Sequence, residues 1–320
     1  MHSGAFFYLT PMYTLPEEYA FGSLEWLSRQ MMDGFVSGLH KSPYHGFSVE
    51  FSEHKMYNPG ESTRHIDWKL FAKTDRLYTK RYEEETNLKC RILIDTSGSM
   101  FYPRRDTINP SKPNKLQFSL LSAAMLMQLF MKQRDAIGLS LFDENTHYES
   151  NMSGTRTHHR FLMREMEQWL KLSTNTRPTA RLADGLHRVA ETQSKRSLII
   201  VFSDFFCADE EEEHSLFDAF QHIAYNNHDL VLYQTRDWET EGDFAVGNNP
   251  LKVIGMEGEG EIKLSPADIQ QAYQKRSKAF QSEFISHCLR YGIDLVDADI
   301  QQDYLKVLQR MLVKRQKISV

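Results

Sequence analysis

An aspartate and two serines alternate directly after a short apolar run near the first third of the chain. Residues 91–94 (RILI) are followed by DTSGS, so Asp95, Ser97 and Ser99 are spaced two residues apart. A carboxylate and two hydroxyls from one loop can converge on a small hard cation, because Mg²⁺ prefers oxygen ligands. The pattern therefore predicts a Mg²⁺ site, with Mn²⁺ as an alternative ion. Asp95 would supply the charge, and Ser97 and Ser99 would be direct ligands.

A second carboxylate follows another apolar run. Asp204 comes after SLIIVFS (residues 197–203), which is the most strand-like segment of the chain. Loops at the carboxyl ends of strands form the binding crevice of an open α/β sheet, so Asp204 is predicted to be an outer carboxylate of the same site. The simpler interpretation is a turn in which Asp95 and Ser97 only accept hydrogen bonds from backbone N–H groups.

Apolar runs alternate with helical periodicity from residue 89 onward. Strands are predicted at 91–94, 136–142, 197–202, 230–233 and 293–296, and hairpins across 146–150 and 251–264. Helices are predicted at 116–131, 161–172, 181–192, 216–224, 266–291 and 304–313. This alternation predicts an α/β fold with a mostly parallel central sheet and helices on both faces. Upstream, residues 16–40 predict a helix and residues 47–51 a strand, which together form an N-terminal extension.

The loop DTSGSM and Asp204 resemble the metal-ion-dependent adhesion site of von Willebrand factor A-like domains. That resemblance implies a von Willebrand factor A-like fold and a further threonine ligand before the helix predicted at residue 181. Aligning the helix starts places Ala180 where the threonine belongs, with Thr179 one residue earlier. We expect Thr179 to complete the metal site.

The segment before this domain resembles the bacterial domain-of-unknown-function family 58. The matching motifs are GFSVEF, YNPGE, RHIDWK, TDRLY and KRYEEE within residues 46–85. The resemblance implies that residues 1–87 are a family-specific helix and strand segment. Residues 88–320 would then be the von Willebrand factor A-like domain, with a hairpin insertion near 240–264. Members are typically encoded beside MoxR-type AAA+ ATPases, which implies such an ATPase as partner.

Composition excludes several classes of function. The net charge is −5, and acidic residues are interleaved with the basic and aromatic ones of residues 64–85, so a nucleic-acid surface is not expected. Cys90, Cys207 and Cys288 are too few and too widely spaced for a disulfide framework. No apolar run approaches the ~20 residues of a membrane span, and no signal peptide is evident. We therefore expect a cytoplasmic protein; peripheral membrane association stays open.

The motifs of common enzymes do not occur in the sequence. A phosphatase of the haloacid dehalogenase type would resemble Asp-x-Asp, but the third residue here is Ser97. There is also no Gly-x-Ser-x-Gly elbow and no phosphate-binding P-loop. We expect a metal-dependent protein-binding module rather than an enzyme, and an adaptor or accessory factor for a MoxR-type ATPase. A Mg²⁺-dependent phosphoesterase and a scaffold with a vestigial metal site remain alternatives.

Overall fold

The computed structural model describes residues 23–39, 53–56, 68–81, 88–105, 107–172, 181–193, 196–207, 209–242, 251–254, 261–264 and 266–309. The chain divides into two compact units. One combines Met1–Asp33 with Lys89–Val320, and the other is Gly34–Leu88. Among the residues described, no helix has the length and apolar character needed to span a membrane.

The larger unit is built on a six-stranded sheet with the order β10-β7-β6-β3-β4-β5. Its strands are β3 (Lys89–Asp95), β4 (Ala136–Phe142), β5 (Thr146–Glu149), β6 (Leu198–Ser203), β7 (Asp229–Arg236) and β10 (Asp294–Asp299). All neighbouring pairs are parallel except β4 with the edge strand β5. The predicted mixed α/β fold with a mostly parallel central sheet is confirmed.

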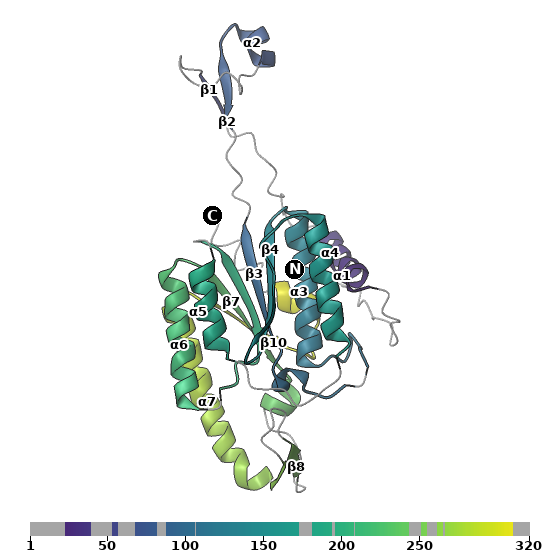
Figure 1. Ribbon diagram of the computed structural model, residues 1–320, viewed down its shortest axis with the longest axis vertical. Coiled ribbons are helices and arrows are strands. Elements are labelled where there is room, and N and C mark those ends of the chain that lie inside the picture. Colours follow the sequence, from purple (N-terminus) through teal and green to yellow (C-terminus); the bar gives the residue numbers. More distant parts are fainter. Residues whose placement is uncertain are drawn as a thin grey trace, which may run out of the picture. The chain divides into compact units, whose positions relative to one another are not determined.

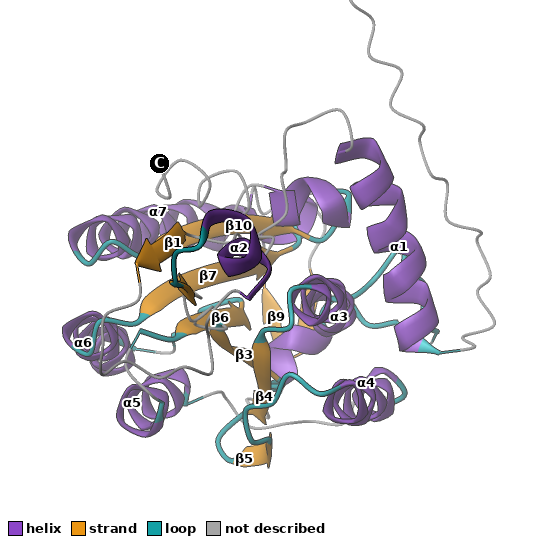
Figure 2. Ribbon diagram, turned by 90° about the horizontal axis from the view of Figure 1, so that it is seen from above, coloured by secondary structure: helices purple, strands orange, loops and turns teal. Residues whose placement is uncertain are grey.

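Helices cover both faces of this sheet (Figures 1 and 2). On one face lie α3 (Lys115–Lys132) and α4 (Arg156–Leu170), with α1 (Leu24–Leu39) outside them. On the other face lie α5 (Leu182–Thr192), α6 (Glu210–Tyr225) and α7 (Pro266–Arg290). Because both faces are covered, β3 and β6 are almost entirely buried, which explains their continuous apolar sequences.

Aromatic side chains form much of the core between the sheet and the helices α5, α6 and α7. Phe284 of α7 is fully buried at the centre of this cluster. Its ring centroid lies 5.1 Å from that of Phe205 and 5.7 Å from that of Phe220. Phe205 belongs to the loop after β6, so this core holds one of the loops at the carboxyl end of the sheet.

Helix α3 is fixed at its first turn by the side chain of Asn114. This side chain accepts a hydrogen bond from the Gln117 backbone N–H, and the Gln117 side chain accepts one from the Asn114 backbone, which makes a capping box. A helical segment at 304–309 packs nearby. There the Tyr304 ring stacks on Phe118 at 4.6 Å, and its hydroxyl donates to the Pro110 carbonyl.

Two further antiparallel strand pairs occur among the residues described, one in each unit. β8 (Leu251–Ile254) pairs with β9 (Glu261–Leu264), which confirms the hairpin predicted across residues 251–264. In the smaller unit, β1 (Glu53–Met56) pairs with β2 (Tyr78–Arg81), and α2 (Trp68–Thr74) lies between them in sequence. The strand predicted at residues 47–51 lies outside the described residues.

Candidate functional site

The candidate site lies where β3 and β6 end side by side. In the sheet, β4 lies on one side of β3 and β6 lies on its other side. The strand order therefore reverses between β3 and β6. Ligands of open α/β sheets bind at the carboxyl ends of strands at such a point. Because Ile94 pairs with Phe202 in register, Asp95 and Ser203 are brought together. The Ser203 hydroxyl donates to Asp95 Oδ2 at 2.6 Å.

The loop after β3 turns its hydroxyls toward one another. Asp95 Oδ1 accepts the Ser97 backbone N–H at 2.9 Å, and the hydroxyl oxygens of Ser97 and Ser99 lie 3.2 Å apart. Thr96 anchors the loop to β4, since both its backbone N–H and its hydroxyl donate to the Phe142 carbonyl. Asp95 and Ser97 are each 1% exposed, so their positions are fixed by packing as well as by hydrogen bonds.

Asp204 joins this loop from the end of β6. Its carboxylate accepts a side-chain hydrogen bond from Ser99, and its Oδ1 accepts the Phe206 backbone N–H at 3.2 Å. The predicted site residues Asp95, Ser97, Ser99 and Asp204 are thus neighbours in space, across about a hundred residues of sequence. Thr179, the fifth predicted ligand, lies outside the described residues.

A buried lysine that the sequence did not single out is attached to this cluster. Lys115 Nζ lies 2.7 Å from Asp204 Oδ2 and 2.7 Å from Glu241 Oε1, and the lysine side chain is only 1% exposed. Glu241 belongs to the short π-helix Trp238–Gly242 after β7, and its Oε2 accepts the Asp237 backbone N–H at 2.9 Å. Lys115 therefore connects the loops that follow β6 and β7, at the carboxyl ends of these strands.

One signal in the sequence could have identified Lys115. It is the first residue of the apolar helix α3. A cation at a helix N-terminus is opposed by the helix dipole, so a lysine there is favourable only when acidic side chains compensate. Those acids are 89 and 126 residues away along the chain, which sequence spacing cannot reveal.

The electrostatics of the cluster follow from burial and from these pairs. Burial, followed by the nearby Asp204 charge, raises the pKa of Asp95 well above its usual range, although hydrogen bonds from Ser203 and Ser97 act in the opposite direction. Burial also opposes ionisation of Asp204, but Lys115 and the surrounding donors outweigh it and lower the pKa of Asp204. Among the described residues, Asp204 has a cationic partner and Asp95 has none.

The donor set fits a small hard dication. Among the residues described, no group of three or more His, Cys, Asp or Glu side chains converges. A metal here would therefore depend on hydroxyl oxygens as well as carboxylates. The 3.2 Å between the Ser97 and Ser99 hydroxyl oxygens is close to the ~2.9 Å that separates adjacent ligands in a Mg²⁺ octahedron. A bound dication would also supply the positive charge that the buried Asp95 carboxylate lacks.

A cavity of about 240 Å³ opens beside Asp95, between the starts of α5 and α6. Its wall combines apolar and charged side chains: Arg181, Leu182, Ala183, Asp184, Phe205, Phe206, Cys207, Glu212, Ser215 and Leu216, with Asp95 and Ser203 at its base. Phe206 lines this opening and is 59% exposed, so its ring is accessible to a second molecule. The cavity gives a second molecule a route to Asp95.

The loop after β6 has a strained backbone at Phe205. This residue has φ of 55°, a left-handed conformation that is costly for a bulky side chain. The turn lets the Phe205 backbone N–H donate to the Ser203 hydroxyl at 3.0 Å, while its ring enters the core against Phe284. The strain is thus offset by packing, and the turn sends Phe205 inward and Phe206 outward.

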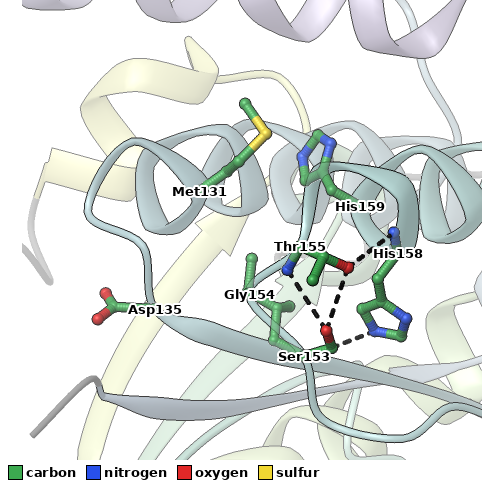
Figure 3. A pocket seen from close by; sticks show the side chains of 8 residues that line it. Met131, Asp135, Ser153, Gly154, Thr155, His158 and His159 are labelled. Atoms are coloured by element: carbon green, nitrogen blue, oxygen red, sulfur yellow. Dashed lines mark hydrogen bonds between the residues drawn. The ribbon is translucent and has the colours of Figure 1, made fainter.

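A second hollow, at the start of α4, does not suit a ligand (Figure 3). It is too narrow to admit a water molecule. Its polar groups mostly satisfy one another, since Thr155 caps α4 by accepting the His158 backbone N–H, and the His158 ring bonds to the Ile137 carbonyl at 3.1 Å. His159 is 3% exposed, and neither of its ring nitrogens has a hydrogen-bond partner among the described residues.

We expect His159 to make the protein less stable in mild acid. Burial is the largest cause that lowers the pKa of His159 below 6.5, and nearby Glu25 only partly opposes it. The stability of the neutral buried ring is present above the unfolded pKa and is lost as the pH falls toward the folded pKa. His159→Leu should flatten the decline in the free energy of unfolding between pH ~7.5 and ~5.5.

Urea denaturation at several pH values measures this effect. The exposed His214 provides the control, and His214→Gln should keep the slope of the unaltered protein. Equal slopes in His159→Leu and the unaltered protein would show that His159 is not the acid-sensitive group.

The comparisons with known proteins identify a family. A family model described as "Protein of unknown function DUF58" matches residues 53–281, more than two thirds of the chain. Uncharacterized proteins of Mycobacterium bovis and Mycobacterium tuberculosis are 28% identical over 81 residues. The match covers 25% of this chain and 26% of theirs, so it spans about a quarter of the length of these relatives.

Two solved structures are among those that are similar to this chain. A conserved hypothetical protein, BatB, from Bacteroides thetaiotaomicron is 15% identical, with a TM-score of 0.42 over 72% of this chain and 99% of that one. An uncharacterized membrane spanning protein from Vibrio fischeri is 14% identical, with a TM-score of 0.22 over 71% of this chain and 96% of that one. Both TM-scores are low, so neither structure supports a conclusion about this chain. By the extent of the family-model match, the chain belongs to the DUF58 family.

Proposed function

We propose that residues 88–320 are a von Willebrand factor A-like domain that binds a partner protein through a Mg²⁺ or Mn²⁺ ion. The ion would be held by Asp95, Ser97 and Ser99, with Asp204 as outer carboxylate. Bound there, the metal offers a ligand position to an acidic side chain of the partner. The class of partner implied by the family resemblance is a MoxR-type AAA+ ATPase, for which this protein would act as adaptor or accessory factor.

The proposal is supported by four oxygen-bearing side chains that lie close together at the point where the strand order reverses. Asp95 and Asp204 come from adjacent strands, and Ser99 is hydrogen-bonded to Asp204. A turn that only satisfied backbone N–H groups would not need the second carboxylate beside the first. Two buried carboxylates repel one another, and a dication between them removes that cost.

The cavity beside Asp95 supports a protein rather than a small ion as the second ligand. An acidic side chain could approach Asp95 through this opening, while the exposed ring of Phe206 would contact apolar groups next to that acid. Aromatic side chains are enriched in protein–protein interfaces relative to the rest of the surface.

A binding assay tests the proposal. We expect the immobilised full chain to retain a MoxR-type AAA+ ATPase from the same organism in Mg²⁺ and to release it in EDTA. Asp95→Ala should lose the ATPase even with Mg²⁺ present, and Phe206→Ser should weaken retention without changing metal affinity. Asp218→Asn, which alters an exposed carboxylate of α6, serves as the matched control and should bind normally. Retention that ignores both EDTA and Asp95→Ala would rule out a metal-bridged complex.

A metal-independent scaffold is the second candidate, and Lys115 is the observation that favours it. Its ammonium already compensates Asp204, so the cluster contains a cation without any metal. Calorimetric titration with MgCl₂ and MnCl₂ separates the two candidates. Binding at millimolar concentration or tighter supports the metal-bridged module, whereas no heat of binding in that range supports the scaffold.

A further inference from the structure

We propose that Lys115 is a built-in counter-cation that weakens metal binding at the Asp95 loop and leaves the bound metal in need of an acidic partner. The inference rests on the proposed metal site and concerns how that site is regulated. It is drawn from the position of one ammonium group between Asp204 and Glu241.

The contacts of Asp204 explain why Lys115 would weaken metal binding. One carboxylate oxygen bonds to Lys115 Nζ at 2.7 Å, and the other accepts the Phe206 backbone N–H. A Lys ammonium has three donors and a full charge, so it competes directly with a metal for the electrons of this carboxylate. With Asp204 held in this way, Asp95 is the only carboxylate of the predicted ligand set that has no cationic partner among the described residues.

The charges of the metal and its ligands determine how strongly the metal would depend on a partner. A dication bound to one fully available carboxylate keeps excess positive charge, and the hydroxyls of Ser97 and Ser99 are neutral. An acid from a partner would neutralise that excess, so metal and partner would bind cooperatively. Removing the Lys115 charge would free Asp204 for the metal, which would then bind more tightly and depend less on the partner.

The contacts around Lys115 hold its side chain and backbone in place. Its side chain is 1% exposed, and its backbone N–H donates to the Tyr102 carbonyl at 2.9 Å. Glu241 is held by the Asp237 backbone N–H on its side chain and by the Tyr273 hydroxyl on its carbonyl. The ammonium is therefore fixed between two anchored acids.

Calorimetry with MnCl₂ on the full chain tests the inference. Lys115→Met removes the charge with little change in side-chain length, and we expect it to tighten Mn²⁺ binding at least about tenfold, because a unit charge a few ångströms away is lost. Lys115→Arg keeps the charge and should leave the affinity within about threefold of the unaltered protein. Lys112→Met alters an exposed lysine of the same segment and should have no effect.

A second readout separates this effect from simple loss of structure. Without Lys115, Asp204 and Glu241 lose their shared cation, so Lys115→Met should have a lower melting temperature in EDTA and should gain more from added MnCl₂ than the unaltered protein does. Damage to the site would instead weaken Mn²⁺ binding. Equal or weaker Mn²⁺ binding by folded Lys115→Met, when the unaltered protein binds Mn²⁺, overturns the inference but leaves the metal site intact.

Glu241→Gln provides a variant with the opposite expectation. It removes the other acid bound to Lys115, so the ammonium is left to Asp204 alone, and Mn²⁺ should bind several-fold more weakly. If Lys115→Met fails to fold, Glu241→Gln becomes the test of the inference. Unchanged or tighter Mn²⁺ binding by Glu241→Gln overturns the inference. If neither the unaltered protein nor the variants bind Mn²⁺, the proposed function fails first and the inference falls with it.

Discussion

Asp95→Asn is expected to weaken Mg²⁺ and Mn²⁺ binding at least about a hundredfold, because loss of a ligand exceeds the 10–100-fold cost of altering an outer partner. The substitution keeps the size of the side chain and an oxygen that can accept the Ser97 N–H. It removes the carboxylate that is hydrogen-bonded to the serine side chains and that has no cationic partner in the part of the chain that the structure describes. Isothermal titration measures the affinity, and urea denaturation in EDTA measures the stability.

The free energy of unfolding in EDTA should not fall by more than about 1 kcal/mol in Asp95→Asn. A buried, charged carboxylate is itself unfavourable, so its loss offsets part of any weakened hydrogen bond with Ser203. Asp218→Asn again serves as control for the metal titration. Unaltered Mn²⁺ affinity in Asp95→Asn would show that the ion, if bound, lies elsewhere.

Phe284→Ala is expected to lower the free energy of unfolding by about 3–5 kcal/mol. The ring is fully buried among Phe205, Phe220 and other apolar side chains, so its removal leaves a cavity that the sheet and helices cannot close. The strained turn at Phe205 loses the contact that offsets its cost. Amide hydrogen exchange should therefore also accelerate across residues 203–207.

The control for this variant lies five residues further along α7. Leu289 is 77% exposed, and Leu289→Ala should change the free energy of unfolding by less than about 0.5 kcal/mol. Destabilisation of Phe284→Ala without faster exchange at residues 203–207 would show that the core and the β6–α6 loop are independent.

Much of the fold follows from apolar patterning in the sequence. The continuous runs of β3, β4 and β6 identify buried strands, and α3 and the β8–β9 hairpin are found within a residue or two. The starts of α4 and α6 are less predictable. α4 begins at Arg156 and α6 at Glu210, several residues before their apolar periodicity, because their first turns are polar and capped by Thr155 and Asp209.

The acidic run 209–213 forms the start of α6. Asp209 caps α6, and four glutamates occupy its first turn, where the helix dipole favours them. Glu213 differs from a solvated residue, because it is 7% exposed and bonds to Arg276 of α7. Pairing between distant helices has no local signature in the sequence.

Part of the candidate site could be predicted from the sequence and part could not. Asp95, Ser97 and Ser99 lie in one loop, and Asp204 follows an obvious strand, so their meeting could be predicted from the rule on carboxyl ends of strands. The ion pairs of Lys115 could not, since they depend on how β6 and β7 lie beside the start of α3. Thr179 stays a prediction, because it lies outside the described residues.

A crystal of the full chain soaked in MnCl₂ would show whether the Asp95 loop binds a metal ion. We expect an anomalous difference peak bounded by Asp95, Ser97, Ser99 and Asp204, and no such peak in a crystal of Asp95→Asn soaked in the same way. A well-ordered loop with no peak at millimolar MnCl₂, and with Lys115 still bonded to Asp204, would contradict this expectation.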